Sequence, residues 1–281
     1  MGTRPGWQPD VKWIISLLAI GVAASSLILA TLAQLTERQP VVNGIAYTYA
    51  IMTSGEKGLD DPSDVKAISE QATQSSDGRL QPIPGISITI NAGELEGLSP
   101  REARLAFMRK IAEPIYDGGA EGFAALATDP ELKSKILSSR ATLDLLSHKT
   151  RDRIVYWLKI DLLILLLFLI GAISCSIRWG RVATLGWVLL LPSLPGTAFW
   201  WAIRQSLPNW ITPTINRTQG IKDMIRFIAA EILPAPAASL FALHRALALA
   251  GLTLILVAVC GGLLFRPSKP KTTELLAQSS L

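Results

Sequence analysis

Four long stretches without a charged residue constrain the fold of this chain more than any other feature of its sequence. These stretches cover Trp13–Ala33, Leu162–Ile177, Val182–Ile203 and Ala246–Phe265. A helix needs about 20 apolar residues to cross a hydrocarbon layer about 30 Å thick. Three stretches reach that length, and the second reaches it when Lys159 and Asp161 lie in its first turns. The sequence therefore predicts an α-helical integral membrane protein with about four transmembrane helices.

The segment between the first two spans has the composition of a folded domain. We expect a mixed α/β extracytoplasmic domain over 35–155. Val41–Met52 is rich in β-branched and aromatic residues, and Ile86–Ile90 alternates apolar with hydroxyl residues, so both segments predict strands. Ser99-Pro100-Arg101-Glu102 predicts the start of a helix, because serine and glutamate three residues apart form a capping box.

The spans and the domain together give a predicted order of segments along the chain. A helical pattern from about Arg140 to Gly171 further predicts that the domain joins the second span through a rigid stalk. The order is a cytoplasmic N-terminus (1–12), a first span (13–34), the domain (35–155), a second span (156–177), a cytoplasmic loop (178–181), a third span (182–203), an extracytoplasmic loop with an interfacial helix (204–244), a fourth span (245–265) and a cytoplasmic tail (266–281).

The distribution of charge argues against nucleic-acid binding and favours one orientation. Residues 35–155 hold 14 Lys/Arg against 17 Asp/Glu, and the rest of the chain holds 13 against 5. The basic excess therefore lies in the flanks and loops of the spans, whereas nucleic acid requires a basic patch on a folded face. Short inner segments hold seven basic residues in 35, and the outer connection 204–244 holds four in 41. This asymmetry predicts that both termini are cytoplasmic.

Polar and helix-breaking positions in the membrane part are candidates for function. Pro192 and Pro195 remove backbone donors from the third span, so this helix should bend or break there, as helices do at many transporter sites. Asp161 is an acid beside a span and should face protein or water. His244 and Arg245 lie at the outer end of the fourth span, where they are suited either to bind lipid phosphate or to reach the interface.

The chemistry expected of an enzyme or a metal site has little support in the sequence. Glu94 and Glu96 form the one acid pair beside a Gly-containing loop, and an acid–base mechanism would require His148 near them. The chain contains no Gly-x-x-x-x-Gly-Lys-Ser/Thr phosphate loop and no Asp-x-Asp-x-Asp-Gly calcium loop. We therefore assign no catalytic residue, no metal ligand and no cofactor.

Three functional interpretations remain open. The first is a non-enzymatic membrane protein whose outer domain senses, binds or docks, with the bilayer and other membrane or envelope proteins as partners. The second is a transport subunit, because the order of spans and domain resembles the layout of FtsX-type permeases; this resemblance implies an ATPase partner at Arg178-Trp179-Gly180-Arg181. The third is a membrane enzyme acting on lipid or envelope polymer through Glu94 and Glu96.

Overall fold

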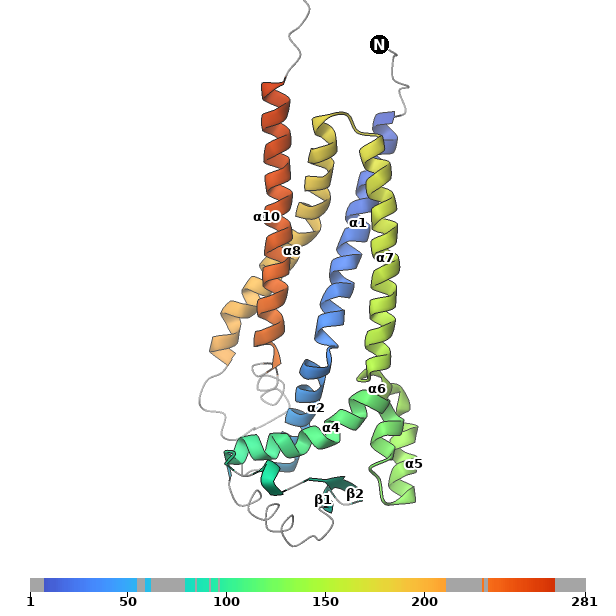
Figure 1. Cartoon of the computed structure of the whole chain (residues 1–281), viewed down its shortest axis with the longest axis vertical. Helices are drawn as coiled ribbons and strands as arrows, with labels where there is room; N and C mark the ends of the chain where they lie inside the picture. Colours follow the sequence, from blue (N-terminus) through green and yellow to red (C-terminus); the bar gives the residue numbers. More distant parts are fainter. Residues whose placement is uncertain are drawn as a thin grey trace, which may run out of the picture.

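The structure is a computed structural model and describes residues 8–54, 59–61, 79–83, 85–90, 92–95, 97–210, 229 and 232–265 of the chain. These residues are mostly helical. Four long helices form a bundle, and the shorter elements lie beyond one of its ends (Figure 1).

The bundle contains four helices that are each long and apolar enough to cross a membrane, which confirms the four predicted spans. The start of α1 and the end of α10 lie at the same end of the bundle (Figure 1). Together the helices indicate a multi-pass membrane protein. They are α1 (Gln8–Leu35), α7 (His148–Ser174), α8 (Trp179–Trp210) and α10 (Pro234–Leu264).

The bundle is built from two antiparallel pairs, α1 with α7 and α8 with α10 (Figure 1). Ala19 and Ala23 of α1 pack with Val188 of α8 and join the two pairs. Within the second pair, Gly186 and Gly251 face each other so closely that a Cβ on Gly251 would lie 2.7 Å from the Gly186 carbonyl oxygen. Glycine therefore lets the backbones of α8 and α10 approach, as small residues commonly do between membrane helices.

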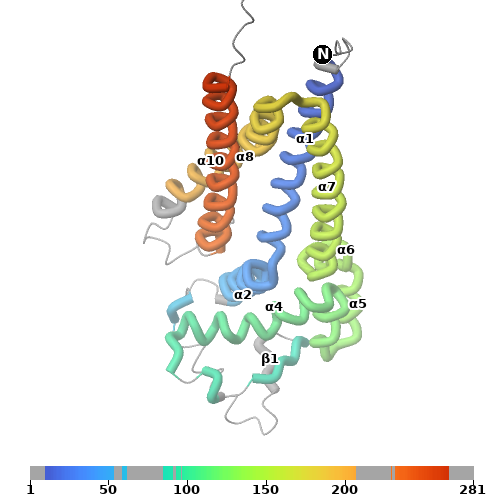
Figure 2. The backbone as a smooth tube through the Cα atoms, turned by 45° about the horizontal axis from the view of Figure 1, so that its top comes forward, coloured from blue at the N-terminus to red at the C-terminus, as the bar shows by residue number. Residues whose placement is uncertain are grey.

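Residues 36–147, which we call the inserted domain, connect α1 to α7. Its described elements are α2 (Arg38–Ser54), β1 (Arg79–Ile83), β2 (Ile86–Thr89), the short 3-10 helix η2 (Ala92–Glu94), α4 (Pro100–Ala124), α5 (Pro130–Ser138) and α6 (Arg140–Leu145). Figures 1 and 2 both show α4 running crosswise below the ends of α1 and α7. Phe107, Ile111 and Ile115 of α4 are at most 1% exposed and form the centre of the core.

The expectation of a mixed α/β domain is wrong for the described residues, which hold several helices and one pair of strands. The segment Val41–Met52, a predicted strand, lies within helix α2. The reason is periodicity: Val42, Ile45, Ala46 and Ala50 are buried at helical spacing and pack on α4. The β-branched and aromatic composition of the segment does not decide its structure, because tertiary packing overrides propensity.

The second predicted strand is confirmed. β2 pairs with β1 in antiparallel fashion, and Ile86, Ile88 and Ile90 are at most 3% exposed, as alternation predicts. Gly85 at the turn has a φ of 82°, a backbone conformation that favours glycine. The helix start at Ser99 is also confirmed, because its hydroxyl accepts from the Glu102 amide while the Glu102 carboxylate accepts from the Ser99 amide.

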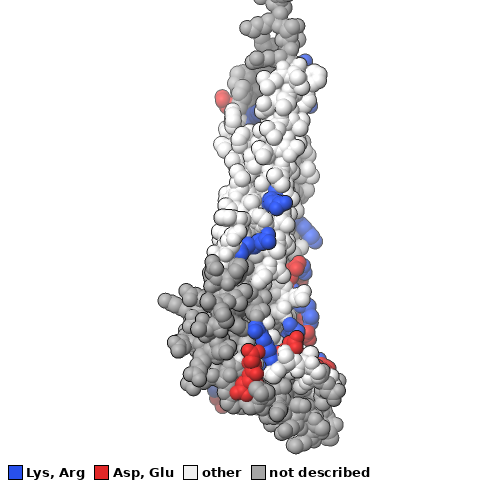
Figure 3. Space-filling model, turned by 90° about the vertical axis from the view of Figure 1, so that its left-hand side faces the viewer, with Lys and Arg blue, Asp and Glu red and all other residues white. Residues whose placement is uncertain are grey.

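The predicted stalk is confirmed in part. α7 runs without interruption from His148 at the domain to Ser174, but it is separate from α6, because Leu146 and Ser147 interrupt the helix between them. Charged side chains concentrate on the inserted domain on the face shown in Figure 3, and few interrupt the surface of the bundle.

The close approach of α8 and α10 gives a testable prediction. Gly251→Ala should lower the free energy of unfolding by about 1–3 kcal/mol, because the added methyl group meets the backbone of Gly186 and Leu190 rather than a movable side chain. Gly262→Ala on the same helix is the matched control, since no atom lies within 4 Å of the position that its methyl group would take. Chemical unfolding in detergent, followed by circular dichroism, measures both; equal stability of the two variants would contradict the close contact.

Candidate functional site

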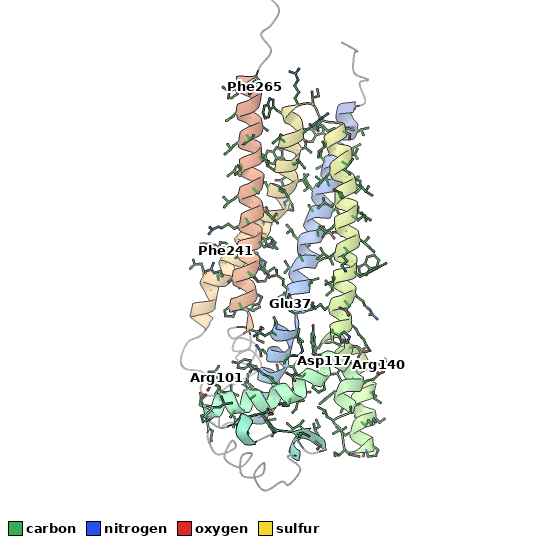
Figure 4. All side chains as sticks on the ribbon, in the orientation of Figure 1. Glu37, Arg101, Asp117, Arg140, Phe241 and Phe265 are labelled. Carbon is green, nitrogen blue, oxygen red and sulfur yellow. The ribbon has the colours of Figure 1, made fainter. Side chains whose placement is uncertain are left out.

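Polar side chains of the described residues gather at three places in the structure. The first is the joint between the inserted domain and the bundle, the second is the contact between α1 and α7, and the third is the bend of α8. Figure 4 shows Glu37, Asp117 and Arg140 around the joint, at the ends of α1 and α7.

The joint begins with a break in α4. The backbone of Gly119 has a φ of 61° and a ψ of −136°, outside the helical region. The carboxylate of Asp144 fills the space that a side chain at position 119 would occupy, and its Oδ1 accepts a hydrogen bond of 3.1 Å from the Ala120 amide. Asp144 thus caps the last part of α4, as an N-cap residue caps a helix start. The Gly118-Gly119 pair would be expected to end this helix, whereas the helix resumes and ends at Ala124.

Asp144 also ties α6 to α7. The Arg140 Nε donates to its Oδ2 at 3.2 Å, and the hydroxyls of Ser147 and Thr150 donate to its backbone carbonyl at 2.7 and 2.9 Å. The hydrogen bond from the Ala120 amide is the main reason that the pKa of Asp144 lies below its usual value. Burial raises this pKa, and Arg140 lowers it further. Asp144 therefore joins three helices: its charged carboxylate bonds α4 and Arg140 of α6, and its backbone carbonyl accepts from the start of α7.

The same joint holds the connection between α1 and α2, which consists of Thr36 and Glu37. The Tyr116 hydroxyl donates to the Thr36 carbonyl at 3.2 Å, and the His148 Nδ1 lies 3.4 Å from the Tyr116 carbonyl, which accepts its proton. Arg151 of α7 pairs with Glu37 at 3.5 Å. Burial raises the pKa of Tyr116. Exposed ion pairs contribute about 0–1 kcal/mol, so the short connections and the hydrogen bonds dominate here.

The second polar site joins α1 to α7 inside the bundle. The Ser26 hydroxyl donates to Asp161 Oδ2 at 2.8 Å and also lies 3.0 Å from the Val22 carbonyl. Ser26 is nine residues from the end of α1 at Leu35, about 13 Å along the axis, so the pair lies within the apolar part of the helices. Asp161 therefore faces protein, as expected of an acid beside a span.

The third site is the bend of α8. The helix is continuous from Trp179 to Trp210 and changes direction between its halves (Figure 1), so the bend predicted from Pro192 and Pro195 is present, whereas a break is not. The Ser193 hydroxyl donates to the Leu189 carbonyl at 2.6 Å. A serine hydroxyl that bonds a carbonyl of the preceding turn in this way is often found where a helix bends.

His244 of α10 packs against this bend. It is 4% exposed, and its Nδ1 donates to the Leu240 carbonyl at 2.8 Å, which leaves Nε2 as the acceptor of the ring. Nε2 and Cδ2 lie directly over Gly196, where any Cβ would collide with the ring. The structure thus brings His244 together with the segment Pro192–Gly196, whereas Arg245 is exposed at the surface.

The remaining predicted candidates do not assemble into an acid–base site. Glu94 in η2 forms an ion pair of 2.8 Å with Lys110 of α4, whereas His148 contacts Tyr116, six residues further along that helix. Glu96 and most of the predicted interfacial helix in 204–244 lie outside the described residues. Across the described ranges, no three His, Cys, Asp or Glu side chains lie close enough together to hold a metal ion.

Two of the residues that build these sites are not evident from the sequence. Asp144 looks like an ordinary helix residue four positions after Arg140, and its role depends on Gly119, which is distant in sequence. Ser26 lies among other small residues of the first span, so nothing local marks it as a hydrogen-bond donor. The only indication is that Asp161, an acid beside a span, requires a donor somewhere in the neighbouring helices.

No protein-family model, no curated protein and no solved structure matches this chain. Its function is therefore inferred from the geometry of the described residues.

The cap at Gly119 predicts a stability that depends on pH. Because the pKa of Asp144 is lowered in the folded state, its contribution is present above the usual aspartate pKa and is lost as the pH falls through the lowered value. Asp144→Ala should lower the midpoint of thermal unfolding at pH 7, and Asp144→Asn should lower it less, since the amide oxygen still accepts from Ala120. Melting curves at pH 7 and pH 3 test this; an Asp144→Ala deficit that stays the same at both values would contradict it.

The pair between α1 and α7 gives a second prediction. Ser26→Ala should lower the free energy of unfolding by about 1–2 kcal/mol, because Asp161 then loses a donor in an apolar environment. Ser25→Ala is the matched control, since Ser25 is the exposed neighbour on the same helix. Unfolding in detergent compares the two variants, and an equally small effect of both would show that the pair adds no stability.

Proposed function

We propose that this protein is a non-enzymatic multi-pass membrane protein that docks a membrane or envelope partner through its inserted domain. The observation that carries the proposal is the joint, in which the domain follows α1 directly at Thr36 and is bonded to the start of α7 by Asp144 and Glu37. A partner held by such a domain keeps a fixed position relative to the spans. Flexible linkers, by contrast, would leave its position variable.

The segment α5–α6 offers the best-supported docking surface. Leu137, Leu145 and Leu146 are 39%, 64% and 40% exposed, and Lys133 and Lys135 are exposed beside them. Exposed apolar groups rimmed by charges are typical of interaction sites. Asp144 of α6 accepts hydrogen bonds from Ser147 and Thr150 at the start of α7. A force that a bound partner applies to this surface would therefore reach α7 directly.

The proposed orientation places the inserted domain outside the cytoplasm and both termini inside. Arg178 and Arg181 flank the short connection between α7 and α8, at the end of the bundle opposite the domain. Short connections that carry arginine favour the cytoplasmic side. In the described part of the chain, this end lies next to the start of α1 and the end of α10 (Figure 1).

The transport interpretation has less support. Only residues 175–178 separate α7 from α8, which leaves no room for a cytoplasmic helix that an ATPase could hold. Arg181 is used locally, because its Nε donates to the Ser176 carbonyl at 3.1 Å. The enzyme interpretation rests on Glu94 and Glu96, and Glu94 is paired with Lys110.

One cross-linking experiment tests docking and orientation together. Ser138→Cys, in a chain whose free Cys175 and Cys260 are replaced by alanine, is treated in intact cells with a membrane-impermeant maleimide that carries a photoreactive group. We expect labelling of the exposed site and, after illumination, one discrete cross-linked product. Adding Leu145→Gln should reduce this product about fivefold, since removal of a central apolar contact typically weakens an interface by that order.

Met52→Gln provides the matched control for this experiment, because Met52 is 65% exposed on α2, outside the α5–α6 surface. It should leave the yield of the product unchanged. Labelling that requires permeabilised cells would contradict the orientation. Normal labelling without a discrete product, or equal losses from Leu145→Gln and Met52→Gln, would contradict docking at α5–α6.

A further inference from the structure

Two arginines from different helices converge on one aromatic ring. The guanidinium carbon of Arg204 in α8 lies 5.3 Å from the centre of the Phe241 ring, and that of Arg245 in α10 lies 6.0 Å from it. The ring itself packs against a cluster around the buried Trp200 and Leu240. Trp200 is 4% exposed and is thus part of the packed support beneath this ring.

Both arginines lie at the depth of the lipid head groups. Arg245 is 19 residues before the end of α10 at Leu264, about 28 Å along the axis, and Arg204 is 23 residues after Arg181, about 34 Å. These lengths match the thickness of a hydrocarbon layer, about 30 Å. The pair therefore marks the boundary on the side of the inserted domain.

The charge of this pair is not neutralised by the described part of the protein. Both side chains are exposed, and no carboxylate of a described residue lies within ion-pair distance of either. Figure 3 shows basic side chains that interrupt an otherwise uncharged surface above the domain. Figure 4 places Phe241 on the α10 side of the bundle, away from α1 and α7. This surface faces the surroundings and not the interior of the bundle.

We propose that Arg204, Arg245 and Phe241 form a binding site for the phosphate of an anionic phospholipid in the leaflet next to the inserted domain. A guanidinium group bonds phosphate oxygens through a planar pair of N–H donors, and stacking on an aromatic ring keeps that plane oriented. The exposed side chains of Leu249 and Leu252 continue along α10 and offer an apolar surface to the acyl chains. Free phosphate shares the head-group chemistry but makes no use of that surface.

Native mass spectrometry of the full chain in mild detergent tests the site with phosphatidylglycerol as the probe. We expect saturable binding to the unaltered protein. Arg204→Gln with Arg245→Gln should raise the half-saturating lipid concentration by at least about tenfold, because the loss of even one charge-assisted bond has about that effect. Arg204→Lys with Arg245→Lys keeps both charges without the planar donors and should give an intermediate value. This second variant also tests the site if the glutamine variant fails to fold, which circular dichroism reports.

Lys159→Gln is the matched control, because Lys159 is an exposed cation on α7 at the same end of the bundle. It should bind lipid as the unaltered protein does. An equal loss on Lys159→Gln would mean diffuse surface charge and would overturn the proposal, as would unchanged binding to the arginine variants. Displacement of the lipid by millimolar inorganic phosphate would identify a free-phosphate site and overturn the lipid assignment.

Discussion

Hydrocarbon offers no water to backbone amides and carbonyls, so every membrane-crossing segment of this chain must satisfy its hydrogen bonds internally. The same constraint decides what the polar side chains of the spans do. Several hydroxyls bond a carbonyl four residues earlier in their own helix, among them Ser174, Ser193 and Thr253. Ser26 also reaches across to Asp161 and makes the register of α1 against α7 specific.

The position of the inserted domain follows from that register. Once α1 and α7 are fixed, they set the positions of Thr36 and Glu37, the first residues of the domain, and of Arg151, which pairs with Glu37. α4 must turn at Gly119 to pass beneath these ends, and the turn exposes amides, one of which Asp144 satisfies. The domain is therefore held by bonds to the backbone, which are more stable than the exposed ion pairs around them.

Features that depend on local pattern are predictable from the sequence, and features that depend on remote contacts are not. The spans follow from uncharged length, the helix start from Ser99 and Glu102, and the bend of α8 from its prolines. The composition of α2 favours a strand, but its buried residues recur at helical spacing. The segment is a helix, so the spacing and not the composition predicts its structure. No local signal indicates that Asp144 caps a helix 24 residues earlier, since this pairing is created by the fold.

The bundle consists of two pairs of helices that differ in how they connect to the domain. α1 and α7 connect directly to the domain. α8 and α10 instead pack chiefly against each other, where Gly186 faces Gly251. The two pairs meet where Ala19 and Ala23 of α1 pack with Val188 of α8. The two pairs therefore differ in what positions them: the connections and bonds to the domain position α1 and α7, whereas contacts within the bundle position α8 and α10.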